Sequence, residues 1–113
     1  MSQKLPRKRR ITRPKEYTQI FQSGKMRKGK YWQVIAKPAT NSGPKLGLAI
    51  SKKVFKLAVE RNRIKRIARE AFRIEQSKLG QWRFVVMAKK NNCNKSSDLS
   101  NELINLFHAL AKS

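Results

Sequence analysis

The residues best suited to chemistry are the cations of the segment KLAVERNRIKRIAREAFR, residues 56–73. It contains seven lysines and arginines: Lys56, Arg61, Arg63, Lys65, Arg66, Arg69 and Arg73. Its only acids are Glu60 and Glu70, and Glu70 could pair with Arg66 or Arg73 one helical turn away. Two carboxylates cannot neutralise seven cations. We therefore expect the remaining positive charge to bind the phosphates of a polyanion rather than to form an ordinary solvated face.

The same segment has the period of an α-helix. At about 100° per residue, its apolar residues gather on one side and most of its cations on the other. The apolar side carries Ile64, Ile67, Ala68 and Ala71. The polar side carries Asn62, Lys65, Arg66, Arg69 and Arg73. The pattern predicts a helix that packs on a folded domain and presents cations to phosphates.

Groups that could catalyse a reaction are scarce. The six acids are spread along the chain: Glu16, Glu60, Glu70, Glu75, Asp98 and Glu102. A metal-dependent nuclease needs several carboxylates that converge on one point. The single cysteine, Cys93, and the single histidine, His108, allow no internal disulfide and no zinc site without carboxylates. The sequence also contains no glycine-rich phosphate loop. We therefore predict no catalytic residue and no metal site in the protein itself.

Two aromatic residues near the N-terminus could bind bases. Tyr17, Ile20 and Phe21 recur at i, i+3 and i+4, which places them on one face of a helix. The rings could pack in the core, or they could stack on unpaired bases as in proteins that bind single-stranded nucleic acid. The residue types alone leave both interpretations open.

Composition indicates the class of partner. The chain has 113 residues, which favours one domain, and 39% of them are hydrophobic, enough for a folded core. Its 28 Lys and Arg against 6 Asp and Glu give a net charge of +22, which favours nucleic acid as the partner. A membrane is disfavoured, because the longest apolar runs, such as residues 84–88, are far shorter than the ~20 residues of a span. The N-terminus lacks a secretory signal, so we expect a cytoplasmic protein.

The positions of the elements follow from local patterns. Residues 1–11 read as a mobile basic arm, and residues 12–113 as a single RNA-binding domain. A first helix is predicted from Thr12, which can cap it, to Gly24, which can end it. Residues 25–30 read as a basic loop. Strands are predicted at 31–37, 45–51 and 83–89, and further helices from about 56 to 79–80 and at 98–112.

The order α-β-β-α-β-α predicts the fold class. A hairpin of the first two strands should be followed by a helical crossover to the third. The result is an α+β protein, a small two-layer sandwich with helices on one face of the sheet.

The run GLAISKKVFKLAVERNRIKRIARE, residues 47–70, resembles the signature of the protein subunit of bacterial ribonuclease P. The matching parts, at the family's spacing, are Ser51-Lys52-Lys53, Ala58-Val59, Arg61-Asn62-Arg63, Lys65-Arg66 and Arg69-Glu70. Tyr17 and Phe21, before Ser23-Gly24, are similar to an aromatic pair on the family's first helix. The resemblance extends over residues 9–110 of this chain.

The resemblance implies a fold shared with domain 2 of ribosomal protein S5, with a left-handed βαβ crossover. Without it we would expect the right-handed form, which about 98% of such crossovers adopt. It also implies a function: the ribonucleoprotein is an endonuclease that hydrolytically removes the 5′ leader of precursor tRNA. Catalysis then belongs to the RNA subunit with Mg²⁺, and the protein holds the catalytic RNA and the single-stranded leader. No protein partner and no cofactor tightly bound by the protein are implied.

The resemblance also assigns roles to residues. The basic helix would contact both RNAs through Arg61, Asn62, Arg63, Lys65, Arg66 and Arg69. Lys52 and Lys53 would meet the RNA backbone, and Tyr17 and Phe21 would line the leader cleft. The chain departs from the family on its first predicted strand, where a cleft aromatic is common and Ile35 stands at the matching position. Tyr31 or Trp32 could replace it, or that part of the cleft could be apolar.

Two other functions fit composition and fold. The first is a ribosomal or assembly protein that coats structured RNA and has no role in tRNA processing. It would not distinguish a tRNA with a 5′ leader from one without. The second is a DNA-binding protein that reads a major groove with residues such as Asn62 and Arg63 at a helix N-terminus, usually as a dimer. Competition with duplex DNA would identify it.

Overall fold

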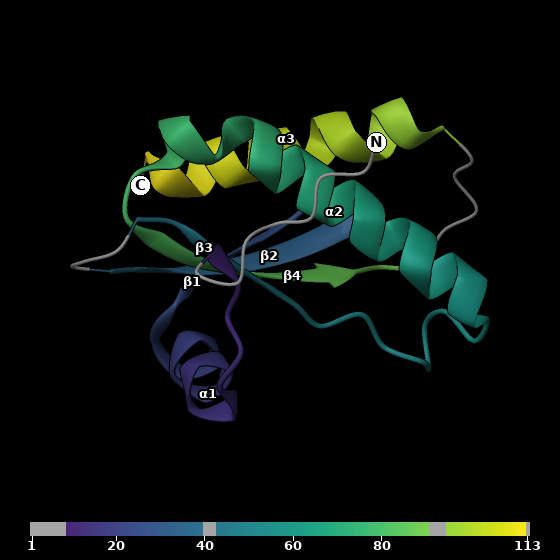
Figure 1. Ribbon diagram of the computed structural model, residues 1–113, viewed down its shortest axis with the longest axis horizontal. Coiled ribbons are helices and arrows are strands. Elements are labelled where there is room, and N and C mark those ends of the chain that lie inside the picture. Colours follow the sequence, from purple (N-terminus) through teal and green to yellow (C-terminus); the bar gives the residue numbers. More distant parts are fainter. Residues whose placement is uncertain (1–8, 40–42, 91–94, 113) are drawn as a thin grey trace.

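The computed structural model describes residues 9–39, 43–90 and 95–112, in the order α-β-β-β-α-β-α. The helices are α1 (Pro14–Ser23), α2 (Ala58–Leu79) and α3 (Ser96–Ala111). The strands are β1 (Lys25–Lys28), β2 (Trp32–Pro38), β3 (Lys45–Leu48) and β4 (Trp82–Ala88). Figure 1 shows α2 and α3 side by side above the sheet and α1 below it. The α+β class is therefore confirmed, with one strand more than the sequence pattern predicted.

The four strands form one mixed sheet in the order β1-β2-β4-β3. β2 is antiparallel to both of its neighbours, β1 and β4, whereas β3 is parallel to β4. The predicted hairpin between the strands at 31–37 and 45–51 was wrong, because β4 lies between them. β2 instead forms its hairpin with β1, in the segment predicted to be a loop. All four residues of β1 are exposed, so no apolar alternation marked it in the sequence.

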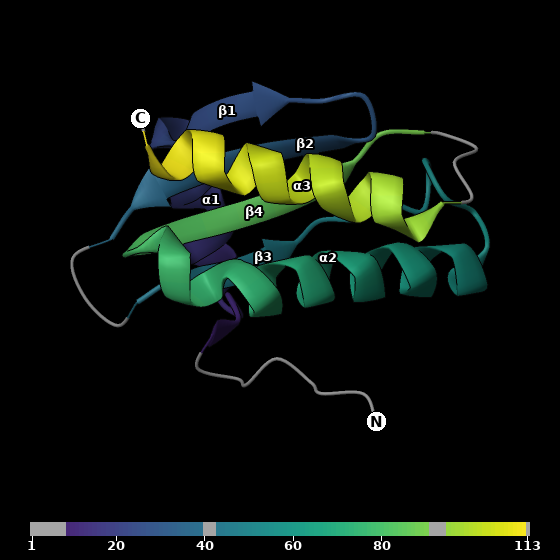
Figure 2. The same cartoon turned by 90° about the horizontal axis from the view of Figure 1, so that it is seen from above.

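The crossover from β3 through α2 to β4 is left-handed. In Figure 2, seen from the side of α2 and α3, β4 runs from left to right with its parallel neighbour β3 below it. From β3 the chain passes through α2, which lies nearer the viewer, and then enters β4 above β3. With the same strand direction, a right-handed crossover would enter a strand below β3. The hand implied by the family resemblance is confirmed.

The two faces of the sheet are covered differently. Alternate residues of β2 and β4, such as Val34 and Phe84, join α2 and α3 in the main core. The intervening residues Ile35 and Val85 pack with Ile20 of α1 in a smaller cluster on the other face. The predicted arrangement with all helices on one face therefore holds for α2 and α3 but not for α1. The reason is that both central strands carry apolar residues on both faces.

Local sequence explains where the helices end. α2 buries the predicted apolar side, Ile64, Ala68 and Ala71, together with Phe72 and Leu79. It ends before Gly80, whose φ of 77° lies in the region that favours glycine. α1 ends at Gly24 as predicted, but Thr12 does not cap it, because the helix begins two residues later and Arg13 occupies the N-cap.

The packed domain includes the residues just before α1. Ile11 is 4% exposed, and its N–H donates to the carbonyl of Leu46 at 2.8 Å. Arg10 forms a parallel bridge with Leu46. The predicted arm therefore overlaps the packed domain at residues 9–11, while its residues 1–8 lie outside the described ranges, as does Cys93. Within the described residues, no helix is long and apolar enough to cross a bilayer.

Candidate nucleic-acid interface

The two predicted aromatic residues of α1 differ in their surroundings. Tyr17 is half-buried, and its hydroxyl donates to the carbonyl of Ile11 at 3.2 Å. Its ring lies against Gly47 of β3, where an added Cβ would stand 2.9 Å from the ring atoms. Phe21 is 45% exposed, so its ring is available to a ligand. One side of the Tyr17 ring therefore packs inside the protein and the other faces the surface, whereas Phe21 contributes mainly to the surface.

The phenol of Tyr17 stays neutral well into the alkaline range. Burial raises the pKa of Tyr17 above the usual 10.0, and Glu16 adds a smaller effect in the same direction. A hydrogen bond with the backbone of Leu48 opposes this shift of the pKa. A neutral hydroxyl adds no negative charge to a surface that is to receive phosphates.

A cavity of about 180 Å³ joins α1, β3 and the basic helix. Its lining residues are Arg10, Ile11, Tyr17, Leu46, Leu48, Lys65 and Arg69. The structure thus brings together an aromatic ring and two cations that the sequence separates by about fifty residues. Such a combination suits single-stranded nucleic acid, because rings stack on bases while cations bind phosphates.

The predicted cations of α2 fall on two sides of the helix. Lys65 and Arg69 border the cavity beside Tyr17. Arg63 and Arg66 border a second hollow of about 410 Å³, which is also lined by Val59, Glu60, Ile67 and Ser96 at the start of α3. Asn62 is exposed. The basic helix therefore carries two separate cationic surfaces.

Arg61 has a structural task besides any contact with RNA. Its guanidinium donates to the carbonyls of Phe55 at 2.8 Å and Lys56 at 2.9 Å. These bonds fix the chain that leads into α2. Arg61 therefore also positions the start of the basic helix.

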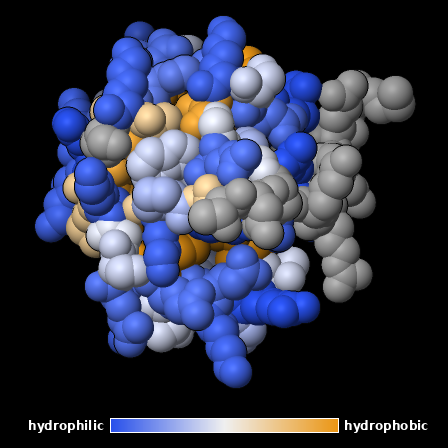
Figure 3. Space-filling view, turned by 90° about the vertical axis from the view of Figure 1, so that its left-hand side faces the viewer, coloured by the Kyte–Doolittle hydropathy of each residue, from blue (hydrophilic) through white to orange (hydrophobic). Residues whose placement is uncertain are grey.

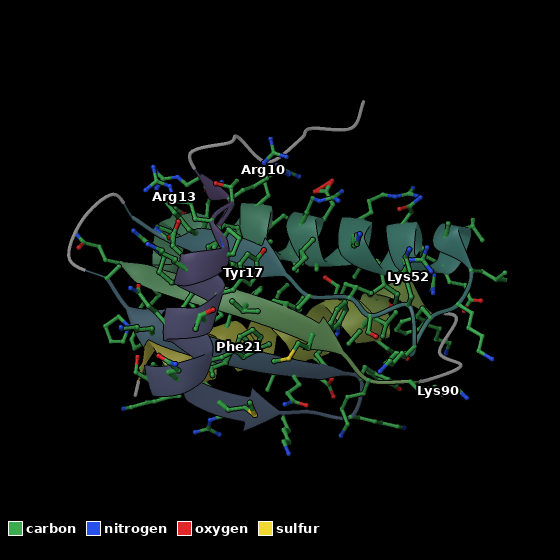
Figure 4. The ribbon with its side chains drawn as sticks, turned by 90° about the horizontal axis from the view of Figure 1, so that it is seen from below. Arg10, Arg13, Tyr17, Phe21, Lys52 and Lys90 are labelled. Atoms are coloured by element: carbon green, nitrogen blue, oxygen red, sulfur yellow. The ribbon has the colours of Figure 1, made fainter. Side chains whose placement is uncertain are left out.

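Lys52 and Lys53 lie in the connection between β3 and α2, and both are exposed. The N–H of Lys53 donates to the hydroxyl of Ser51 at 3.0 Å, which turns the chain there. Figure 4, seen from the α1 side, shows Tyr17 and Phe21 on α1, with Lys52 across the sheet from them and Lys90 beyond the end of β4. These side chains border an area of the sheet that α1 leaves uncovered.

The strand residue facing α1 is now identified. Ile35 is 2% exposed and packs in the cluster beneath α1, so it forms part of the floor rather than an open contact. Trp32 is fully buried in the core on the opposite face, where its indole N–H donates to the carbonyl of Leu99 at 2.8 Å. Tyr31 also packs against that core. The partly exposed β2 residues on the α1 face are Gln33 and Lys37, and the amide of Gln33 donates to the sulfur of Met26 at 3.0 Å.

Most of the acids are engaged in contacts within the protein. Glu70 pairs with Arg73 at 2.9 Å, Glu75 with His108 at 2.6 Å, and Glu16 lies 3.8 Å from Arg83. Glu102 accepts hydrogen bonds from three backbone N–H groups of residues 30–32. No three acids, histidines or cysteines of the described ranges converge as metal ligands. The side chains thus do not fit a Mg²⁺ site held by this part of the protein alone.

The surface as a whole favours a polyanion. Figure 3 shows one side of the molecule, where most of the surface is hydrophilic and apolar groups appear only in small areas. The charged groups of the chain are mainly cations, since 28 Lys and Arg stand against 6 Asp and Glu. Cations border both hollows beside α2: Lys65 and Arg69 line one, and Arg63 and Arg66 line the other.

Sequence comparison identifies relatives of the chain. Residues 5–111 match the family described as Ribonuclease P. The chain is 50% identical over 107 residues to the ribonuclease P protein component of Vesicomyosocius okutanii, a match that covers 95% of each protein. It is 43% identical over 106 residues to the ribonuclease P protein component of Vibrio cholerae, covering 94% of this chain and 85% of the relative.

Solved structures share the fold. The RNase P protein of Staphylococcus aureus superposes with a TM-score of 0.71 at 24% identity, covering 92% of this chain and 93% of that one. The RNase P protein of Thermotoga maritima gives a TM-score of 0.65 at 25% identity, covering 91% and 88%.

Four residues of this surface were missed in the sequence. Arg10, assigned to the arm, lines the cavity with Tyr17. Gly47 allows Tyr17 to lie on β3. Met26 and Gln33 contact one another on the α1 side of the sheet. The signal for Gly47 was its place in the matching run, whereas nothing in the local pattern distinguished the other three.

Proposed function

Because the chain belongs to the bacterial ribonuclease P protein family, we propose that it holds the 5′ leader of precursor tRNA between α1 and the sheet. It is a component of the ribonuclease P endoribonuclease and a partner of its RNA, and it takes part in the 5′ maturation of tRNA. The observation that carries the proposal is the cavity that joins Tyr17 to Lys65 and Arg69.

The leader is single-stranded, so its bases are free to stack. Phe21 offers an exposed ring, and Tyr17 offers the open edge of a half-buried one. Lys65 and Arg69 stand where they can bind the phosphates of the stacked nucleotides, and Lys52 lies across the open floor. Base stacking contributes ~1–3 kcal/mol per base without regard to sequence, which suits a protein that must accept many different leaders.

The other side of α2 is the better candidate for the catalytic RNA. Arg63 and Arg66 border the hollow beside α3, on the side of the helix away from Tyr17. A protein that holds two RNAs together needs two cationic surfaces, because each RNA brings its own phosphates. We therefore assign Lys65 and Arg69 to the leader, and Arg63 and Arg66 to the catalytic RNA. Asn62 and Arg61, at the start of α2, would contact either RNA, and Lys53 the RNA backbone.

The chemistry of cleavage falls to the RNA and its Mg²⁺. A hydrolytic metal needs several oxygen ligands, and the described acids are dispersed or paired with other side chains. The metal would activate water and stabilise the leaving oxygen within the RNA. The protein's part is to position the leader and to offset phosphate repulsion, which lowers the Mg²⁺ concentration that the complex requires.

This role also suggests where the protein acts. A precursor tRNA is processed where it is transcribed, so we place the protein in the bacterial cytoplasm. Its surface charge is satisfied by RNA, and the role requires no protein partner.

The deciding experiment is cleavage of a precursor tRNA by a bacterial ribonuclease P RNA at low Mg²⁺, with and without this protein. We expect the protein to restore removal of the leader and mature tRNA to compete poorly. Unchanged cleavage together with tight RNA binding would contradict the proposal and favour a protein that only coats RNA. A variant at Phe21 should lower precursor affinity while leaving affinity for the catalytic RNA unchanged.

A further inference from the structure

The edge strand β1 carries a second concentration of positive charge, on the opposite edge of the sheet from β3. Lys25, Arg27 and Lys28 lie on the strand, and Lys30 follows it in the turn to β2. All four side chains are exposed. Lysines on an edge strand commonly prevent pairing with other chains, so their presence alone does not indicate a ligand. The surroundings of this strand supply the further argument.

The acid that α3 brings to this edge does not neutralise the strand. The carboxylate of Glu102 accepts hydrogen bonds from the backbone N–H groups of Lys30, Tyr31 and Trp32, at 2.6, 2.7 and 3.1 Å. Within the described ranges, Lys25, Arg27 and Lys28 form no ion pair. The hairpin is thus anchored by an acid while its own cations stay available.

The register of the sheet assigns the β1 side chains to its two faces. Met26 is opposite Ile35 and Lys28 is opposite Gln33, and opposite residues of a pair share a face. Since Ile35 packs under α1, Met26 and Lys28 lie on the α1 face with Gln33. Arg27 is opposite Val34 of the main core and therefore lies on the other face.

The α1 face at this edge also exposes apolar side chains beside its cations. Phe21 is 45% exposed and Met26 is 44% exposed. They lie on either side of Gly24, which joins α1 to β1. The amide of Gln33 uses one N–H on the sulfur of Met26, which leaves its carbonyl oxygen and its second N–H for a ligand. An apolar surface, an amide and a lysine thus lie along the end of the cleft.

We propose that Met26, Lys28 and Gln33 extend the leader cleft to the β1 edge and bind nucleotides upstream of those stacked on Phe21. The inference rests on the proposed function and adds a second binding site for the same single-stranded RNA. Lys28 binds a phosphate, while Met26 and Gln33 contact a base. The sheet spans about 14 Å from β3 to β1, three strand spacings, so a strand of RNA that crosses it reaches both cationic edges.

The test compares Lys28→Gln with Arg27→Gln, a matched control on the same strand that faces the other way. Precursors with leaders of about four and about ten nucleotides are bound to the holoenzyme. At 0.1 M salt, loss of one phosphate contact should weaken binding of the long leader about fivefold and reduce its salt slope by about 0.7. Lys28→Gln should show this loss for the long leader only, and Arg27→Gln for neither leader. Thermal unfolding confirms that both variants are folded.

Other results would overturn the inference. An equal loss of affinity for precursors with short and long leaders would mean that Lys28 contacts the catalytic RNA or acts only through the overall positive field of the protein. An equal loss in both variants would show that only net charge matters, and no loss would remove Lys28 from the interface. Phe21→Ala, measured alongside, separates this failure from that of the proposed function. If Phe21→Ala weakens binding of both precursors while Lys28→Gln weakens binding of neither, the proposed leader cleft is supported and its extension to β1 is rejected.

Discussion

The two faces of the sheet use the same strands for opposite purposes. On the α2 and α3 side, Trp32, Val34 and Ala36 are completely buried. On the α1 side, the intervening Gln33 and Lys37 remain partly exposed, and only Ile35 between them is buried. One face is therefore closed and provides stability, whereas the other is only partly covered, and it is there that we propose the leader binds. Because successive side chains of a strand point to opposite faces of the sheet, the same strands can be closed on one face and open on the other.

This comparison predicts that stability and RNA affinity respond to different substitutions. The largest effect should come from the closed face. Phe84 lies in a cluster of rings, with centroids 5.0 Å from Phe107 and 6.2 Å from Phe72, that joins β4 to both covering helices. Phe84→Ala should lower the free energy of unfolding by ~3–5 kcal/mol, because it removes a buried ring and leaves a cavity. Urea denaturation measures this, and a loss below about 1 kcal/mol would show that the core is not closed.

The next effect concerns the junction of the two faces at Gly47. An added methyl group there would stand 2.9 Å from the ring of Tyr17, so the ring must move. Gly47→Ala should cost about 1–3 kcal/mol in stability, as overpacked sites do, and should also weaken leader binding. Gly80→Ala, which is strained by a φ of 77° and lies outside the cavity lined by Tyr17, is the control for general strain. If Gly47→Ala binds leaders normally, the position of Tyr17 does not matter to the cleft.

A purely functional effect is expected at Phe21. Phe21→Ala should cost about 1–3 kcal/mol of leader affinity if the ring stacks on a base. Its exposure of 45% predicts a much smaller change in unfolding than Phe84→Ala produces. Binding of precursor and mature tRNA, together with thermal unfolding, separates the two roles. Unchanged precursor binding in a folded variant would reduce Phe21 to a packing residue.

The smallest effect should appear at high pH through Tyr17. Its pKa is raised in the folded protein, mainly by burial, so the folded state keeps its proton after the unfolded chain has lost it. The stabilisation is therefore complete below pH 10.0 and declines as the pH rises through the folded pKa. Tyr17→Phe removes the group, so its stability difference from the natural protein should shrink above pH 10.0. A constant difference would show that the phenol is not buried.

Periodicity predicted the parts of the fold that local residues determine. The apolar stripe of Ile64, Ala68 and Ala71 identified α2 and the face it buries. The apolar run in β4 indicated burial on both faces, and it is indeed covered on both. β1 could not be predicted, because its residues are all exposed and it is a strand only through pairing with β2. The order of the strands in the sheet could not be predicted either, because periodicity does not indicate which strands pair.

The site was predictable to a similar extent. Residue types and the family resemblance selected Tyr17, Lys65 and Arg69, which the fold brings to one cavity. The carbonyl contacts of Arg61 were not predictable, because they depend on the path of the chain before α2. Trp32 was a candidate for the cleft by residue type, but its register places it in the opposite core. A shift of one residue along a strand exchanges the two faces, and sequence pattern alone does not fix that choice.

The strand order has a consequence for how the protein is made. β4 lies between β2 and β3, yet it leaves the ribosome after both of them. The β1–β2 hairpin can form early, but β3 has no strand to pair with until β4, which ends at Ala88, has emerged. α3, which completes the core, emerges later still. During this interval the cationic segments are already outside while the core is unfinished. Folding then depends on contacts between distant residues, and the core can close only once α3 has emerged.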